Sequence, residues 1–188
     1  MAESKTVLPG DFLGTSEEFM PGPGTCDEDG KIYAVARGTL NVNTQERVVS
    51  VLAPNAPPEI KEGTVVYGRV NDARGTFVLL EVACVQGQET RAVPKLENAL
   101  IHVSNIRDSY VEYADREFAY MDIVRAKIID AKALKLGTAG KNLGVVKAYC
   151  SSCRVAMVKK GENRVECPLC LRTESRKLAD DYGRGLPA

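Results

Sequence analysis

The sequence has no apolar run long enough to cross a membrane, and no apolar segment follows its first six residues. The longest runs, such as Phe77–Leu80, fall far short of the about 20 residues that a transmembrane helix needs. The start of the chain likewise lacks the apolar core of a secretory signal. Because its cysteines are spaced like metal ligands, we expect free thiols in a reducing, cytoplasmic compartment and no membrane partner.

The chain also lacks an excess of charge of either sign. Its 188 residues include 25 Lys or Arg and 25 Asp or Glu, a formal net charge of zero. Residues 1–58 carry four basic and eight acidic side chains, whereas residues 149–188 carry eight and five. A protein that binds nucleic acid tightly by itself obtains most of its affinity from phosphate contacts, which this balance disfavours. The distribution suits a subunit that docks through an acidic N-terminal part and contacts RNA weakly elsewhere.

Motifs of catalysis are absent as well. Gly137–Lys141 is no phosphate-binding P-loop, because its glycines lie closer together than those of that motif. His102, the only histidine, lies near Ser104, but the sequence implies no acidic partner for a hydrolase. We therefore expect no catalytic residues and no enzyme.

Four cysteines near the C-terminus are the strongest positive signal. Two Cys-x-x-Cys pairs, separated by 13 residues, bring together Cys150, Cys153, Cys167 and Cys170. This pattern predicts one tetrahedral zinc ion, and two disulfides or an iron–sulfur cluster are the alternatives. Because all four ligands are cysteines, no coordination position stays open for substrate, and the zinc would be structural.

The segment between the two cysteine pairs predicts a hairpin. Val155–Val158 reads as one strand, Lys160–Asn163 as the turn and Arg164–Glu166 as the second strand. A hairpin held by a metal between two cysteine pairs is a zinc ribbon, which we assign, with the tail, to residues 149–188.

The rest of the chain predicts two further small β domains, so the expected fold class is all-β. Residues 1–58 form an N-terminal β-barrel or sandwich unit, with strands near Lys31–Ala36 and Gln45–Leu52, turns at Gly38 and Asn41–Thr44, and a proline-rich end. Residues 59–148 contain about five short strands, which is typical of an OB-fold barrel. Leu143–Lys147 is expected to be the strand that closes this domain.

The middle domain resembles the S1-type RNA-binding fold. The matching segments are Gly68–Val70, Gly75–Val78 and Leu100–Ile106. The resemblance implies that Phe77 and His102 stack on bases of single-stranded RNA and that Arg74 and Lys127 contact phosphates. Without the resemblance, Phe77 would more often be a core residue and His102 a core or turn residue.

The order of the three domains resembles an archaeal exosome cap subunit that carries a zinc ribbon. Further segments carry this resemblance: Pro9–Asp11, Pro21–Thr25, Ile32–Ala34, Val49–Val51 and Leu143–Cys153. It implies that residues 1–58 dock on a hexameric ring of RNase PH-like subunits, which degrades RNA from its 3′ end by phosphorolysis. It also implies a sister cap subunit with a KH domain, which this chain lacks. Arg154 departs from the family, whose first metal knuckle often has glycine there.

We therefore expect a non-catalytic cap subunit that binds single-stranded RNA and guides it into the ring. The alternative is an RNA-binding accessory factor of transcription or translation that uses the ribbon as an interaction module. A metal-dependent enzyme is a third possibility, disfavoured by four-cysteine ligation.

Overall fold

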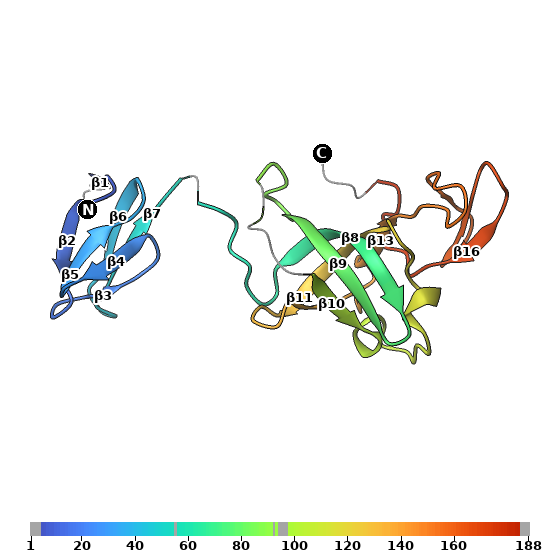
Figure 1. Cartoon of the computed structure of the whole chain (residues 1–188), viewed down its shortest axis with the longest axis horizontal. Coiled ribbons are helices and arrows are strands. Elements are labelled where there is room, and N and C mark those ends of the chain that lie inside the picture. The colour runs from blue at the N-terminus through green and yellow to red at the C-terminus, as the bar shows by residue number, and fades with distance from the viewer. Residues whose placement is uncertain (1–4, 55, 92, 94–97, 185–188) are drawn as a thin grey trace. The chain divides into compact units, whose positions relative to one another are not determined.

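The computed structural model describes residues 5–54, 56–91, 93 and 98–184, and the chain forms two compact units, Met1–Ala56 and Pro57–Ala188 (Figure 1). Parts of the polar segment 86–98 and of both termini lie outside the described residues. Within the described ranges, helical structure consists of two 3-10 turns, η1 (Val103–Asn105) and η2 (Ala114–Arg116). The all-β expectation is confirmed, and none of the described helices is long and apolar enough to span a membrane.

The first unit contains two small sheets. One has the order β1 (Thr6–Val7), β6 (Gly38–Asn43), β7 (Val48–Leu52), β3 (Met20–Pro21). The other has the order β2 (Phe12–Thr15), β5 (Lys31–Ala34), β4 (Thr25–Glu28). Val7, Ala34 and Val51 are buried between them.

The expected turns of this unit fall largely within a strand. Residues 38 and 41–44 were expected to be turns, but β6 is a strand that pairs with β7 from Thr39 to Asn43. The turn begins at Asn43, whose side chain accepts hydrogen bonds from the backbone of Gln45 and Glu46. Asparagine favours turns because its side chain can accept such backbone hydrogen bonds, and this preference does not show whether the turn begins before or after the residue.

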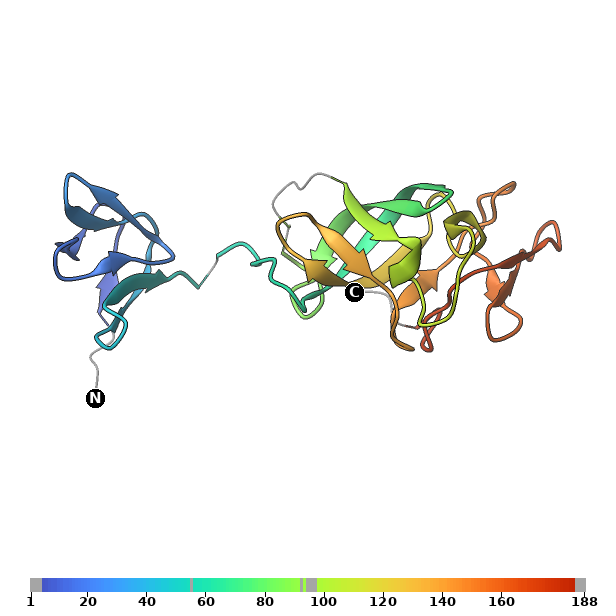
Figure 2. The ribbon, with the colours of Figure 1, turned by 90° about the horizontal axis from the view of Figure 1, so that it is seen from below.

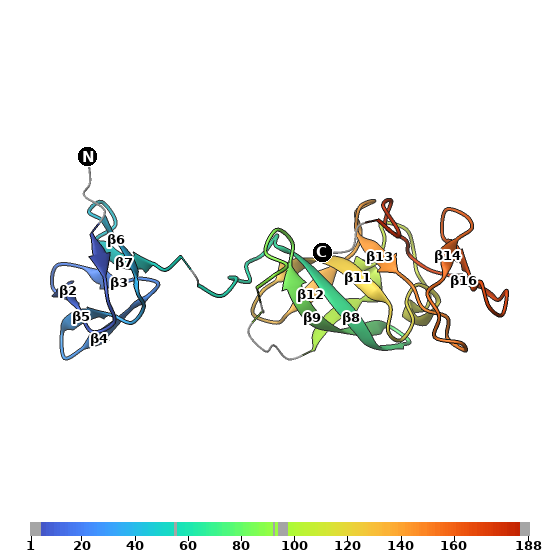
Figure 3. The same cartoon turned by 90° about the horizontal axis from the view of Figure 1, so that it is seen from above.

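The second unit is built on a closed barrel of five strands, as predicted (Figures 2 and 3). The strands are β8 (Val65–Arg74), β9 (Phe77–Val85), β10 (Ala99–His102), β11 (Ile123–Asp130) and β12 (Lys135–Gly137). β8 lies between β9 and β11, β10 follows β9, and β12 closes the barrel between β10 and β11. The β10–β12 pair is parallel and the other pairs are antiparallel, which is the arrangement of an OB fold.

The strand expected at Leu143–Lys147 is present, but it lies outside the five-stranded barrel. β12 closes the barrel, and β13 (Gly144–Lys147) pairs with the first residues of β11. Val145 also bridges to Leu178 near the C-terminus. Since β13 is covered on one side by the barrel and on the other by the C-terminal segment, Val145 and Val146 are both fully buried. Because both faces of β13 are buried, its sequence is a continuous apolar run, as in a central strand of a sheet.

The ribbon follows β13 and is a three-stranded sheet of β14 (Val158–Lys159), β15 (Arg164–Glu166) and β16 (Thr173–Ser175). Its hairpin is present, but β14 is shorter than the predicted strand 155–158. The N–H of Cys150 donates to the Val155 carbonyl, and the N–H of Met157 donates to the Ala148 carbonyl. The backbone before β14 is therefore hydrogen-bonded to the segment that contains the first cysteine, and not to β15.

Barrel and ribbon share one hydrophobic core. The cluster that contains Phe118 and Leu80 of the barrel also contains Met157, Val165 and Leu178 of the C-terminal part. The ribbon is therefore supported by the barrel through buried side chains, as well as being linked to it through the chain.

Candidate metal centre and nucleic-acid interface

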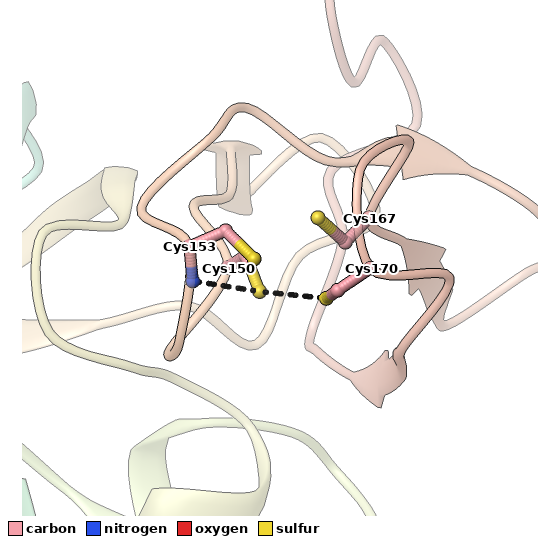
Figure 4. Close-up of side chains that lie close together, drawn as sticks. All are labelled: Cys150, Cys153, Cys167 and Cys170. Atoms are coloured by element: carbon pink, nitrogen blue, oxygen red, sulfur yellow. Dashed lines mark hydrogen bonds between the residues drawn. The ribbon is translucent and has the colours of Figure 1, made fainter.

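The four cysteines singled out from the sequence converge on one point (Figure 4). Their Sγ atoms all lie within 4.8 Å of one another, and those of Cys150 and Cys170 are 3.7 Å apart. Cys150 and Cys167 are buried, whereas Cys170 is exposed. The geometry confirms that the two pairs form a single cluster which could bind a metal ion.

The cluster has the size and donor set of a tetrahedral thiolate site. Zn–S bonds of about 2.3 Å place the sulfurs of a regular tetrahedron about 3.8 Å apart. The 3.7 Å separation matches this edge and is far longer than a disulfide bond. With four sulfur donors, the site offers nothing for the hard cations that prefer oxygen.

Repulsion among the four sulfur atoms, once ionised, favours a bound cation. The backbone N–H groups of Cys153 and Ser152 lower the pKa of the Cys150 thiol to about 7. The neighbouring Cys170 sulfur, followed by burial, raises the pKa of Cys153 to about 12. Thiolates packed this closely repel one another, so a bound cation is needed for all four to be ionised at neutral pH.

Two turns of the same conformation present the cysteine pairs. The N–H of Arg154 donates to the Cys150 carbonyl, and the N–H of Leu171 donates to the Cys167 carbonyl. Arg154 (φ 56°) and Leu171 (φ 58°) both have left-handed backbones. Glycine tolerates this region without the steric cost that Cβ imposes. The departure noted at Arg154 thus leaves the turn geometry intact and adds backbone strain.

Substituting Arg154→Gly is expected to stabilise the metal-loaded chain. The relief of left-handed strain, about 1–2 kcal/mol, exceeds the about 0.5–1 kcal/mol that glycine loses in backbone entropy. Thermal unfolding of the metal-loaded protein should therefore shift upward by a few degrees. Arg154→Ala is the matched control, because it removes the side chain but keeps the strained Cβ; an equal upward shift in both variants would contradict this explanation.

A buried ion cluster holds the first cysteine turn against the barrel. Asp122 is fully buried and accepts hydrogen bonds from the N–H of Tyr149 (3.0 Å), the N–H of Ala119 (2.9 Å) and Nε of Arg176 (2.8 Å). Burial raises the pKa of Asp122, and Arg176 counteracts this effect.

Arg176 also pairs with Glu174, whose carboxylate accepts from the Ser151 hydroxyl at 2.6 Å. The backbone on both sides of Cys150 is therefore fixed by residues from the barrel and from β16.

Sequence reasoning did not find this cluster. Asp122 and Arg176 are separated by 54 positions, and each looks like an ordinary surface charge beside a strand. Nothing in the sequence pairs them, because the contact depends on how the ribbon packs on the barrel.

Three of the four predicted RNA-contact residues lie in one row across adjacent strands. Phe77 on β9 is opposite Arg74 on β8 and opposite His102 on β10. All three are exposed, with 39% of Phe77 accessible, whereas the next residue, Val78, is fully buried. Strand alternation thus places the three side chains on the outer face of the barrel.

His102 is held in a defined orientation. Its Nδ1 lies 2.9 Å from the Ser104 hydroxyl and accepts the Ser104 N–H at 3.3 Å, which caps η1. An Nδ1 that accepts the backbone N–H leaves the proton of a neutral imidazole on Nε2. Arg74 pairs with Asp72 at 3.0 Å on the surface, where such pairs are weak enough to exchange for a phosphate.

Lys127 lies elsewhere on the barrel, opposite Val65 at the start of β8, whereas Arg74 ends that strand. It lines a cavity of about 680 Å³ that also contains Ser104 and Asn105. The same two residues line a smaller cavity with His102. Lys127 is thus not part of the row, although Ser104 and Asn105 line both its cavity and that of His102.

Comparison with known proteins identifies the family. The chain is 38% identical over 179 residues to "Exosome complex component Csl4" of Archaeoglobus fulgidus, covering 95% of this chain and 97% of that protein. It is 30% identical over 185 residues to "Exosome complex component CSL4" of Mus musculus, covering 92% and 91%. The chain belongs to the Csl4 family. The resemblance read from the sequence is therefore confirmed.

The Csl4 relatives span both compact units of this chain, and a second family match lies in the first. Residues 6–43 match the family described as "Exosome complex exonuclease RRP4 N-terminal region". The chain is also 27% identical over 145 residues to "Exosome complex component Rrp4" of Methanothermobacter thermautotrophicus, covering 76% of this chain and 42% of that protein. The part of the first unit from β1 to β6 is thus similar to a region found in more than one exosome component.

Proposed function

We propose that this chain is a non-catalytic cap subunit of an RNA exosome, which binds single-stranded RNA and guides it into a phosphorolytic ring. The observation that carries the RNA-binding part is the row of Arg74, Phe77 and His102. The Phe77 side chain, the oriented His102 imidazole and the Arg74 guanidinium lie on one exposed face of the barrel. The first two can stack on bases and the third can contact a phosphate. Full-length similarity to Csl4 proteins supports the exosome over a freestanding factor of transcription or translation.

The remaining parts of the proposal assign partners and domain roles. Residues 1–58 dock on a hexameric ring of RNase PH-like subunits, residues 59–148 bind RNA as an S1-type domain, and residues 149–188 form the ribbon and tail. A sister cap subunit with a KH domain shares the same assembly, and the complex works in the cytoplasm. Similarity to an Rrp4 component supports a common mode of docking.

We further propose that the cysteine cluster holds one structural zinc ion. Four thiolates at tetrahedral separation favour zinc, and they leave no open position at which the metal could activate water. The role of the metal is then to hold the two cysteine turns together.

Substituting Phe77→Ala is expected to weaken RNA binding by one to two orders of magnitude. A base stacked on an aromatic ring contributes about 1–3 kcal/mol, which corresponds to about 5- to 150-fold in affinity. Fluorescence anisotropy with a labelled single-stranded oligonucleotide at low salt measures the change. His102→Ala should have a similar effect, and the double variant should bind least.

Exposed Val42 on β6 provides the matched control, because Val42→Ala removes a surface apolar side chain outside the barrel. It should bind as the wild type does. If the double variant Phe77→Ala with His102→Ala keeps wild-type affinity, RNA binds elsewhere. Incubation of the isolated chain with RNA and phosphate should leave the RNA intact; turnover that a point substitution abolishes would contradict the non-catalytic assignment.

A further inference from the structure

Two tyrosines are exposed on the segment that leads into η2. Tyr110 is 92% exposed and Tyr113 is 43% exposed. Between and after them, Val111 and Ala114 are buried in the barrel core. The backbone that carries the two rings is therefore anchored, while the rings themselves face solvent.

This tyrosine segment, residues 110–114, adjoins the RNA row. The N–H of Ala114 donates to the carbonyl of Gly75 at 2.8 Å. On the other side of the same β8–β9 turn, the N–H of Val103 donates to the carbonyl of Thr76 at 2.8 Å. The turn that joins Arg74 to Phe77 is thus hydrogen-bonded on one side to the residue after His102 and on the other to the residue after Tyr113, which places the tyrosine segment next to the row of Arg74, Phe77 and His102.

The charges around Tyr113 favour stacking over phosphate contact. The Arg116 guanidinium lies 5.0 Å from the centre of the Tyr113 ring and pairs with Glu112 at 3.3 Å. Asp108 and Asp115, on either side of the segment, add further negative charge. An acidic surface gains little from phosphates, whereas a partly exposed ring with a guanidinium over one face presents two planar groups on which a base can stack.

We propose that Tyr113, together with Tyr110, extends the RNA face by stacking on further bases of the strand held at Phe77 and His102. This inference rests on the RNA-binding function proposed above. It assigns the segment a ligand class, single-stranded RNA, and a mode of binding that does not depend on sequence.

The test compares oligonucleotides of about four and about ten nucleotides, the range that one OB fold covers. Affinities of the full-length, metal-loaded chain for labelled oligoadenylate are measured by fluorescence anisotropy. Tyr113→Leu should weaken binding of the longer oligonucleotide about tenfold and leave the shorter one unchanged, because only the longer strand reaches Tyr113. Tyr113→Phe keeps the ring and should bind as the wild type does. Tyr120→Leu, at a 61% exposed tyrosine beyond η2, is the matched surface control.

The salt dependence separates stacking from charge. The fold-loss in RNA affinity caused by Tyr113→Leu should be the same at low and moderate salt, whereas Arg74→Gln should reduce the dependence of RNA affinity on salt.

If Tyr113→Leu binds both lengths like the wild type while Phe77→Ala is weakened, the extension is wrong and the proposed function stands. If Phe77→Ala is unaffected too, the RNA face itself is wrong. If Tyr113→Leu keeps its RNA affinity but no longer assembles with the other subunits, the segment is a protein contact, which also overturns the proposal.

Discussion

Replacing Cys167 with serine is expected to unfold the ribbon and to lower the thermal stability of the barrel. Structural zinc contributes roughly 10 kcal/mol or more to the folding of such small units, as much as the stability of many whole domains. The strands β14, β15 and β16 span only two or three residues each. They cannot replace that contribution through their own hydrogen bonds and packing.

The effect should reach the barrel because the two parts share a core. Cys167 and Val165 lie in the same buried cluster as Phe118, so loss of the ribbon exposes apolar barrel surface to water. Arg176 would also move away from Asp122, so this carboxylate, fully buried in the folded chain, would lose its cationic partner. The closed barrel retains its strand pairing but unfolds at a lower temperature.

Hydrogen exchange and elemental analysis together check this result. In Cys167→Ser, the amides of Met157 and Leu171 should lose protection, while those of β8 and β9 remain protected. The wild type should contain one zinc per chain and the variant little or none. Cys26→Ser is the matched control, since Cys26 lies in β4 outside the cluster, and it should keep both zinc and protection. Native protein without metal, or with iron and sulfide, would sink the zinc assignment.

Local patterns account for what the sequence predicted well. A Cys-x-x-Cys pair is one turn of chain, so its geometry is set by neighbouring residues, and two such turns joined by a hairpin meet at one metal. The exposure of Phe77 was expected only from the resemblance to the S1-type fold, because an aromatic residue in a strand is more often a core residue; in β9 it is exposed and the next residue, Val78, is buried.

Long-range contacts account for what it missed. β12 has only three residues, Lys135–Gly137, and is a strand because β10 and β11 flank it, whereas the apolar run at Val145 had the stronger strand signal. Likewise, burial of Asp122 depends on Arg176, which reaches it only when the ribbon packs on the barrel. A pattern that depends on two distant segments has no period in the sequence to reveal it.

Removing apolar side chains from the surface of the first unit is expected to weaken assembly with the proposed ring strongly. Leu8, Phe12 and Val35 are each more than half exposed, at 55%, 55% and 54%. Backbone hydrogen bonds bring them together, because the N–H of Asp11 donates to the Leu8 carbonyl and the N–H of Ala34 donates to the Asp11 carbonyl. The Phe12 ring is further held edge-on against Tyr33, with centroids 6.0 Å apart.

These residues have the character of an interface centre. Specific interfaces combine a small apolar centre with a polar rim, and truncation of a central side chain costs about 2 kcal/mol or more. The eight acidic side chains of residues 1–58 then serve approach and orientation rather than affinity. The double variant Leu8→Ala with Phe12→Ala should therefore bind the ring at least about 100-fold more weakly.

Co-elution with the separately purified ring, followed by titration calorimetry, measures this loss. Deletion of residues 1–56 should abolish co-elution altogether; the cut is placed there because Pro58 is buried in the second unit. Both variants should keep their metal and their weak RNA affinity, which shows that the second unit is intact. Val42→Ala, on the other sheet of the first unit, should assemble like the wild type. If the truncated chain assembles with the ring as tightly as the full chain, the barrel or the ribbon is the anchor. The exposed cluster at Leu8 and Phe12 would then need a different partner, because the acidic unit around it would play no part in docking.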